Sequence, residues 1–317
     1  MSFRFRLRSA AVLCAVLVAG ALPEAGAQAP FGRRPAAAPA EAMESGSVEI
    51  ENSDGAAGKF ALPPATRVER DLAYGAAAAQ RIDVYVPDGA RNAPILLMVH
   101  GGGWIIGDKG NAGSVANKVR HWLPRGYIVA STNYRMARPP NALEQAEDVG
   151  RALAFVQANA ASWGGDGSRV VLLGHSSGAH LVALLTAAPA VAAASGAKPW
   201  LGTVALDSAA LDLVALMNAR HARLYDRVFG ADPGRWAELS PLHRLAARPL
   251  PMLLVCSSRR TDSCAAARRF ADKAVSLGGR ATTLSLDLGH GEINSELGRS
   301  ASYTASIEEF LRSVGLP

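Results

Sequence analysis

The sequence predicts an α/β fold in which helices cover both faces of a parallel sheet. Short runs of apolar, often β-branched residues alternate along the chain with segments of helical period. Some of these runs, such as Pro94–Val99, are continuously apolar, which is typical of strands buried on both faces. Glycine-rich or polar turns follow several runs, and in such folds functional groups gather at the carboxyl ends of the strands.

The expected strands are short. Arg81–Val86 alternates in character, as a half-buried strand does, and ends at the turn Pro87–Gly89. The other expected strands are Pro94–Val99, Tyr127–Ala130, Val170–Leu173, Leu201–Leu206, Met252–Val255 and Ala281–Leu286.

Helices are expected between these strands. Between Asn141 and Asn159, the residues Val149, Leu153 and Val156 recur at helical spacing, and Asn141 can cap the first turn. Further helices are expected at Ala179–Ala187 and Ala265–Leu277, and at the end of the chain, where Ile307, Phe310, Leu311 and Val314 share one face.

The composition describes a folded globular protein. The 317 residues are 49% hydrophobic and 19% charged, which is enough material for a large core. The net charge of +6 is spread along the chain, without a basic run interleaved with aromatics. We therefore expect no nucleic-acid partner.

The first 27 residues have the pattern of a secretory signal peptide. Three arginines precede the apolar stretch Ala10–Leu22, and Ala25–Ala27 supplies a cleavage site of small residues. The apolar stretch is too short to span a bilayer, so we expect no stable membrane insertion. Cleavage removes three arginines and one glutamate, leaving a net charge of +4. The predicted location is secreted or periplasmic.

The remainder divides into a linker and a domain. Residues 28–64 are rich in alanine and proline without a sustained period, which predicts a flexible linker. Residues 65–317 form the predicted domain. Removal of Cys14 with the signal peptide leaves Cys256 and Cys264, and an even count in an oxidising compartment predicts a disulfide between them.

The segment Gly174–Gly178 is the most informative motif. Its sequence, Gly-His-Ser-Ser-Gly, lies between an expected strand and an expected helix, which is the setting of a nucleophile elbow. The turn is so sharp that the flanking residues must lack side chains, and the strain exposes the hydroxyl of Ser176. Ser176 is therefore the candidate nucleophile.

A second glycine-rich turn follows the strand Pro94–Val99. In His100–Trp104, three consecutive glycines allow backbone N–H groups to point into a pocket and stabilise a developing oxyanion. The N–H of Ser177, at the start of the helix after the elbow, is the other candidate donor.

The base is expected after the last strand. His290 lies there between Gly289 and Gly291, in a turn able to bring an imidazole over the serine. Two aspartates at strand ends could orient it, Asp262 and Asp207. Both satisfy the chain order Ser…Asp…His. The strand order favours Asp262, which follows the strand Met252–Val255, and a disulfide bracing its loop would hold the carboxylate in place.

Together these motifs resemble the α/β-hydrolase superfamily, in its carboxylesterase and lipase-like branch. The resemblance rests on His100–Trp104, Tyr134-Arg135 and Gly174–His180, and covers about residues 65–317. It implies an eight-stranded, mostly parallel sheet, a triad of Ser176, Asp262 and His290, and oxyanion donors at Gly102, Gly103 and Ser177. The sequence departs from the family where five polar residues, Ser257–Thr261, delay Asp262 beyond its usual position.

The function that this reading implies is hydrolysis of carboxylic esters through an acyl-enzyme. Between Asp207 and Leu250 there is room for only a few short helices, so we expect a small or absent cap and small, short-acyl substrates. Trp104 is expected to line the pocket. The predicted chemistry needs no metal or organic cofactor. The alternatives are an amide hydrolase of the aryl-formamidase type and a catalytically silent binding protein with the same fold.

Overall fold

The computed structural model describes residues 60–136 and 140–317. The expected signal peptide and almost all of the expected linker lie outside the described residues. Phe60 and Leu62, at the end of that linker, pack against the core, with the Phe60 ring 6.0 Å from that of Tyr85. Packing therefore begins before residue 65, where the domain boundary was expected.

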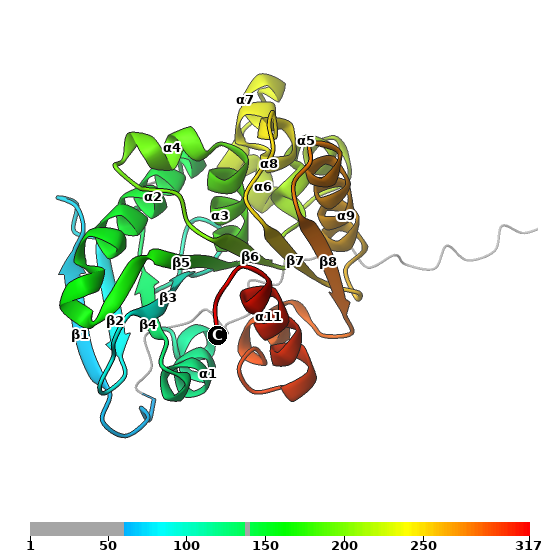
Figure 1. Ribbon diagram of the computed structural model, residues 1–317. Helices are drawn as coiled ribbons and strands as arrows, with labels where there is room; N and C mark the ends of the chain where they lie inside the picture. The colour runs from blue at the N-terminus through cyan, green and yellow to red at the C-terminus, as the bar shows by residue number, and fades with distance from the viewer. Residues whose placement is uncertain (1–59, 137–139) are drawn as a thin grey trace, which may run out of the picture. The chain divides into compact units, whose positions relative to one another are not determined.

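An eight-stranded sheet forms the centre of the described chain (Figure 1). Its order is β1-β2-β4-β3-β5-β6-β7-β8. The first two strands pair antiparallel with their neighbours, and all the others are parallel, as predicted. The strands are β1 Arg67–Ala73, β2 Arg81–Val86, β3 Ala93–Val99, β4 Ile128–Thr132, β5 Gly165–His175, β6 Gly202–Leu206, β7 Met252–Ser257 and β8 Ala281–Leu286.

The edge strand β1 was not expected from the sequence. Its residues are mostly exposed or half-buried, so the apolar pattern that identifies the inner strands is weak there. The inner strands β3 and β4 are buried along their whole length, and the continuous apolar runs predicted this.

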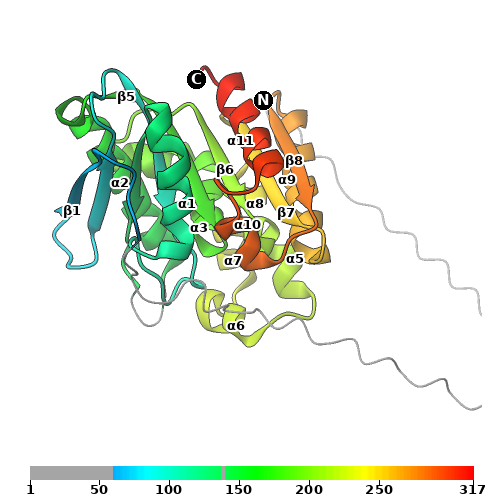
Figure 2. The same ribbon diagram turned by 90° about the horizontal axis from the view of Figure 1, so that it is seen from below.

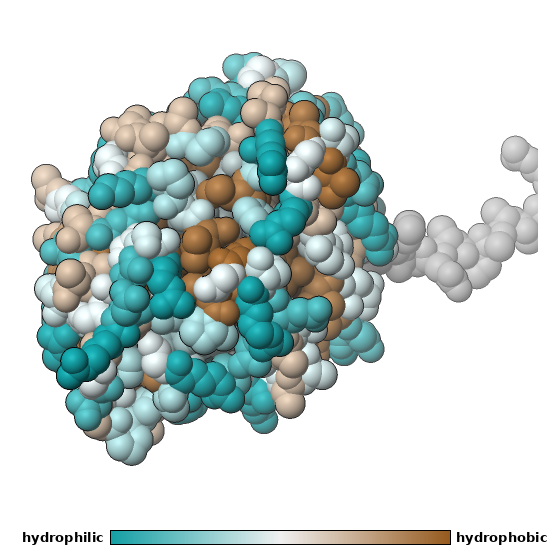
Figure 3. Space-filling model, viewed as in Figure 1, coloured by the Kyte–Doolittle hydropathy of each residue, from teal (hydrophilic) through white to brown (hydrophobic). Residues whose placement is uncertain are grey.

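Helices cover both faces of the sheet (Figures 1 and 2). One face carries α2, α3, α4 and α9, and the other carries α1, α10 and α11. Their bounds are α1 Ala112–Trp122, α2 Ala142–Asn159, α3 Ser177–Ala187, α4 Pro189–Ala194, α9 Thr261–Ser276, α10 His290–Ser295 and α11 Ala301–Ser313. Figure 3, which shows the molecule from the same side as Figure 1, has mostly hydrophilic or neutral side chains at the surface and an apolar area near the centre of the view.

Local sequence explains the best-defined helices. The side chain of Asn141 accepts a hydrogen bond from the backbone N–H of Glu144, so the predicted cap of α2 is confirmed. Every residue of α3 is buried, which matches its almost purely apolar composition.

A 3-10 helix, Ala209–Asp212, and four short α-helices connect β6 to β7. The four α-helices are α5 Leu213–Asn218, α6 Arg223–Phe229, α7 Pro233–Leu239 and α8 Pro241–Arg244, which we call the cap segment. Figure 2 shows α6 at the end of the sheet away from the C-terminus. The cap segment is small, as predicted.

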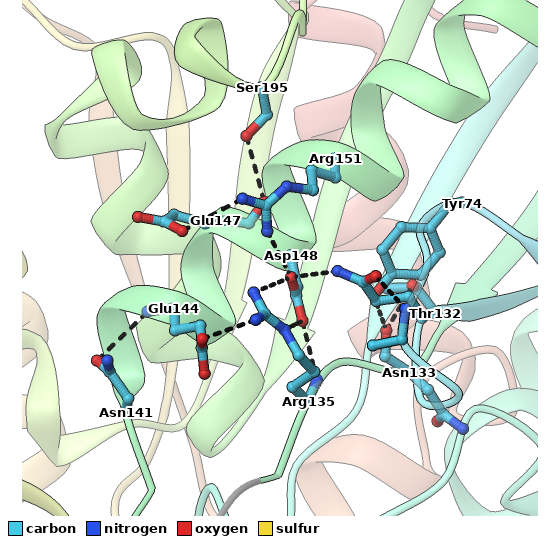
Figure 4. A network of polar contacts seen from close by, with 12 residues as sticks. Tyr74, Thr132, Asn133, Arg135, Asn141, Glu144, Glu147, Asp148, Arg151 and Ser195 are labelled. Carbon is cyan, nitrogen blue, oxygen red and sulfur yellow. Dashed lines mark hydrogen bonds and ion pairs between the residues drawn. The ribbon is translucent and has the colours of Figure 1, made fainter.

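A buried carboxylate ties α2 to the chain after β4 (Figure 4). Asp148 has no exposed side-chain surface and accepts hydrogen bonds from Arg135 at 2.8 Å, Arg151 at 2.7 Å and Gln80 at 2.7 Å. Burial opposes ionisation, but the hydrogen bonds from Arg135 outweigh it and lower the pKa of Asp148. The backbone at Tyr134 and Arg135 is thereby fixed beside α2.

We predict that Asp148→Asn lowers the free energy of unfolding by about 1.5–3 kcal/mol, because it removes the charge-assisted hydrogen bonds from two partly exposed arginines, Arg135 and Arg151. Urea denaturation followed by circular dichroism measures the change. The lowered pKa means that the contribution is present above the unfolded pKa of about 3.9 and is lost as the pH falls through the folded value.

The matched control is Glu147→Gln, which removes a half-exposed carboxylate from the same helix turn and should cost less than about 1 kcal/mol. Equal losses in the two variants would contradict a special role for Asp148.

Candidate active site

The turn at Ser176 has the strained geometry that the glycines predicted. Ser176 has φ 55° and ψ −118°, between the end of β5 and the start of α3. A Cβ on Gly174 would lie 2.4 Å from the carbonyl oxygen of Gly178, and one on Gly178 would lie 2.3 Å from that of Val99. Neither position can hold a larger residue without moving the backbone.

His290 lies directly over this serine. Its Nε2 atom is 3.0 Å from Ser176 Oγ, and its Nδ1 atom is 2.6 Å from Asp207 Oδ2. The carboxylate requires Nδ1 to be the protonated nitrogen, which leaves Nε2 free to accept the serine proton. Ser176, His290 and Asp207 follow the carboxyl ends of β5, β8 and β6, which meet at one edge of the parallel sheet.

The expectation that Asp262 orients His290 is corrected by this geometry. Asp262 lies in the first turn of α9 and is 49% exposed. Its carboxylate faces Arg260 Nη2 at 3.5 Å and accepts the backbone N–H of Ser263, and within the described residues it has no hydrogen bond to His290. The polar residues after β7 place Asp262 in the first turn of α9, away from His290. The other candidate, Asp207, follows the neighbouring strand β6 and lies beside His290 Nδ1.

Asp207 is held by the segment after β7, which we call the disulfide loop (Ser257–Ser263). Ser257 donates its backbone N–H to Asp207 Oδ1 at 2.8 Å, and Ser263 donates its hydroxyl to the same oxygen at 2.5 Å. Arg260 Nη1 donates to Oδ2 at 2.8 Å. Burial disfavours the charged carboxylate, but His290 and Arg260 outweigh it and hold the pKa of Asp207 well below its usual range.

Cys256 and Cys264 form a disulfide at the two ends of this loop. Both residues are buried, and their Cα atoms are 5.1 Å apart. The loop between them supplies three hydrogen-bond donors to Asp207. The disulfide therefore stabilises the loop whose residues donate hydrogen bonds to Asp207. It does not stabilise a loop that contains the carboxylate itself, as was expected for Asp262.

The glycine loop, His100–Gly107, follows β3 and lies beside the elbow. Gly102 and Gly103 have φ of +116° and +60°, and a Cβ on Gly102 would lie 2.1 Å from the carbonyl oxygen of Ile106. Within residues 60–136 and 140–317, the N–H groups of Gly102 and Gly103 have no hydrogen-bond acceptor. They are available to a ligand, and the N–H of Ser177 lies at the start of α3.

Tyr134 connects this loop to the elbow. Its ring stacks on that of His100 with centroids 4.5 Å apart, and its hydroxyl donates to the His100 carbonyl at 3.2 Å. The same hydroxyl lies 3.4 Å from Ser177 Oγ. Asp148 holds the backbone N–H of Arg135, the residue after Tyr134, so the network around Asp148 (Figure 4) supports the position from which Tyr134 contacts the glycine loop.

Trp104 lies in a buried aromatic cluster. Its indole packs on Phe229 and Tyr225 of α6 and donates a hydrogen bond to His180 Nδ1 at 3.2 Å. His180 donates its other ring N–H to the Leu239 carbonyl at 2.8 Å. Burial lowers the pKa of His180 to about 4, so this ring is neutral at pH 7 and joins the cap segment to α3.

His175, inside the elbow motif, supports the candidate base. Its Nε2–H donates to the carbonyl of His290 at 3.0 Å, and the two ring centroids are 4.6 Å apart. Burial, followed by the neighbouring charge of His290, lowers the pKa of His175 well below its usual value. This contact could not be predicted from the sequence, because the residue before the serine of such an elbow has no steric requirement.

Residues 60–136 and 140–317 contain neither a metal-binding cluster nor a membrane-spanning helix. These residues contain no group of three or more His, Cys, Asp or Glu side chains arranged to hold a metal ion. Within the same ranges, no helix has the length and apolar content needed to cross a membrane.

Residues 82–197 match the BD-FAE family. The segment includes the glycine loop and the elbow, whereas Asp207, Arg260 and His290 lie beyond it. Over 119 residues (37% of this chain), the sequence is 37% identical to a probable isoprenylcysteine alpha-carbonyl methylesterase, ICMEL1, of Oryza sativa subsp. japonica. Over 125 residues (39% of this chain), it is 34% identical to carboxylesterase NlhH of Mycobacterium tuberculosis. These matches span 27% and 39% of the relatives' own lengths.

Solved structures match over more of the chain. Esterase B from Lactobacillus rhamnosis (HN001) has a TM-score of 0.64 at 18% identity, covering 81% of this chain and 87% of that one. The truncated form of a carbohydrate esterase from gut microbiota has a TM-score of 0.66 at 18% identity, covering 78% and 96%. The solved structures show that the described chain has the α/β-hydrolase fold, as its motifs predicted, and over 37–39% of its length the sequence is similar to proteins named as esterases.

Proposed function

We propose that the protein is a serine hydrolase that cleaves carboxylic esters, with Ser176 as nucleophile, His290 as general base and Asp207 as the orienting acid. The observation that carries this proposal is the continuous line of hydrogen bonds from Asp207 through His290 to Ser176. The candidate base lies within hydrogen-bonding distance of both the candidate nucleophile and the candidate acid, which is the arrangement that acyl transfer requires. The similarity to proteins named as esterases supports the same reaction class.

In the proposed reaction, Ser176 Oγ forms a bond to the ester carbonyl carbon while its proton passes to His290 Nε2. Asp207 stabilises the resulting imidazolium through Nδ1–H. The carbonyl π electrons move onto oxygen, and the N–H groups of Gly102, Gly103 and Ser177 are the proposed donors to that oxyanion. The intermediate collapses, and the alcohol leaves with the proton from His290. Water then cleaves the acyl-enzyme by the same steps.

Short-acyl esters are the proposed substrates. A Cβ on Gly103 would lie 2.8 Å from Leu224 Cδ2, so α6 packs directly on the glycine loop and restricts the space next to the proposed oxyanion site. Trp104 is buried against the same helix, and we propose that it contributes to the pocket by holding α6 in place. The proposed reaction needs no metal or organic cofactor. The export of the protein, which we predict from its first 27 residues, stays a prediction.

We predict that a fluorophosphonate probe labels the wild-type protein at one residue, and that Ser176→Ala abolishes the labelling. The serine is the only group proposed to form a covalent bond with the probe. Intact-mass and peptide mass spectrometry measure this, with Ser177→Ala as the matched control that keeps its backbone N–H. No labelling of folded wild-type protein would favour a silent binding protein.

For acyl-chain length, we expect kcat/KM for p-nitrophenyl acetate or butyrate to exceed that for the palmitate ester by at least about tenfold, because α6 closes over the glycine loop. Initial rates on a chain-length series measure it. Faster hydrolysis of long chains would contradict the proposed pocket. Much faster hydrolysis of N-formylkynurenine than of any ester would instead indicate an amide hydrolase.

Asp207→Asn should lower kcat by about 10³–10⁴-fold, since the amide removes the negative charge and disturbs the imidazole tautomer. Asp262→Asn is the matched control at the other candidate position, and at pH 8 it should stay within about threefold of wild type because its carboxylate is half-exposed and faces Arg260. Steady-state kinetics on p-nitrophenyl butyrate, with circular dichroism to verify folding, separate them. A large loss of kcat in Asp262→Asn but not in Asp207→Asn would show instead that Asp262 orients His290.

A further inference from the structure

Arg260 is the residue that the proposed triad does not explain. It is the last residue before α9, and its side chain is only 24% exposed. Its Nη1 atom lies 2.8 Å from Asp207 Oδ2 and also 2.8 Å from His290 Nδ1. A permanent cation therefore contacts both the acid and the base of the site.

Arg260 and His290 share one acceptor, Asp207 Oδ2. Arg260 Nη1–H and His290 Nδ1–H are both donors, and both point to Asp207 Oδ2. Two donors can share the carboxylate oxygen while the imidazole is neutral. When His290 gains a proton, its positive charge lies next to that of the guanidinium, which disfavours the imidazolium.

The backbone holds Arg260 in this position. Its N–H donates to the carbonyl of Ser257, and its carbonyl accepts from Cys264 at the end of the disulfide loop. Tyr225 of α6 packs close to the guanidinium, and burial raises the pKa of this phenol to about 12, so Tyr225 supplies no counter-charge at neutral pH.

Asp262 supplies a counter-charge from the outer side. Its carboxylate is 3.5 Å from Arg260 Nη2. The order Asp207, Arg260, Asp262 alternates in charge, so Asp262 offsets part of the effect that Arg260 has on the base. Asp262 thus acts on the site through Arg260 rather than through His290.

The other groups near His290 are on several elements. His175 of β5 stacks on the ring, and buried Lys118 of α1 bonds to Asn294 on α10, the helix that His290 begins. On the side of the turn, Arg259 pairs with the exposed Asp287 and Glu292. None of these is within hydrogen-bond distance of the His290 ring nitrogens in the described residues, whereas Arg260 is.

We propose that Arg260 is a positioning residue that sets the pH range of the reaction: by sharing Asp207 Oδ2 with His290 it weakens the stabilisation that Asp207 gives to a protonated imidazole, and Asp262 moderates this effect. The proposal rests on the proposed function, because it assigns His290 the role of base. It predicts opposite effects for the removal of Arg260 and of Asp262, which a purely structural role for either would not produce.

The test measures the rate of fluorophosphonate labelling of Ser176 from pH 4.5 to 9, which needs no knowledge of the natural substrate. The labelling rate falls towards acidic pH as the base is protonated, and we call this part of the pH profile the acid limb. In Arg260→Met the acid limb should move to higher pH by about one unit. Arg260→Lys keeps the charge and should keep the wild-type limb. In Asp262→Asn the limb should move to lower pH by roughly 0.3 unit, since this carboxylate is half-exposed and screened. Arg268→Met and Asp272→Asn, exposed positions further along α9, are the matched controls.

Shifts of the same sign in Arg260→Met and Asp262→Asn, or an unchanged limb in both, would overturn the proposal. If Arg260→Met does not fold, the direction of the Asp262→Asn shift decides, because that residue is at the surface. Failure of the wild type to label would overturn the proposed function itself. If labelling depends on Ser176 but its pH dependence is the same in wild type, Arg260→Met and Asp262→Asn, the proposed function is retained and only the role of Arg260 is contradicted.

Discussion

The hydrogen bond between His290 Nδ1 and Asp207 Oδ2 is the interaction on which the arrangement of the site depends. A carboxylate without exposed surface needs a partner for each oxygen, or its burial would cost several kcal/mol. The fold meets this need with a backbone N–H, a hydroxyl, an imidazole and a guanidinium. Three of these come from one short loop, so the position of that loop after β7 fixes the acid on β6.

The fold and part of the site could be predicted from the sequence. The sharp turn at Ser176 leaves no room for a Cβ atom at Gly174 or Gly178, so these two glycines reveal the turn in the sequence itself. His290 follows the last strand between two glycines, and strand ends of a parallel sheet meet at one edge, so its approach to Ser176 follows from topology. The inner strands were visible because burial on both faces demands continuous apolar runs.

The choice between the two aspartates could not be made in the same way. Asp207 and Asp262 both follow strands, and the decision depends on how the disulfide loop folds back over β6. The contribution of His175 was equally hidden, because a hydrogen bond to the carbonyl of a residue 115 positions away leaves no local pattern. The edge strand β1 was missed because its exposed face lacks the apolar signal.

Asp207 follows β6, whereas the loop that holds its carboxylate follows β7. β6 and β7 are held in register by their ladder and by the hydrogen bond from the Asp207 N–H to the Val255 carbonyl. A local opening between these two strands would separate the carboxylate from its donors while the rest of the sheet stayed paired. The proposed hydrolytic activity would therefore depend on this one strand pair, and its loss need not coincide with global unfolding.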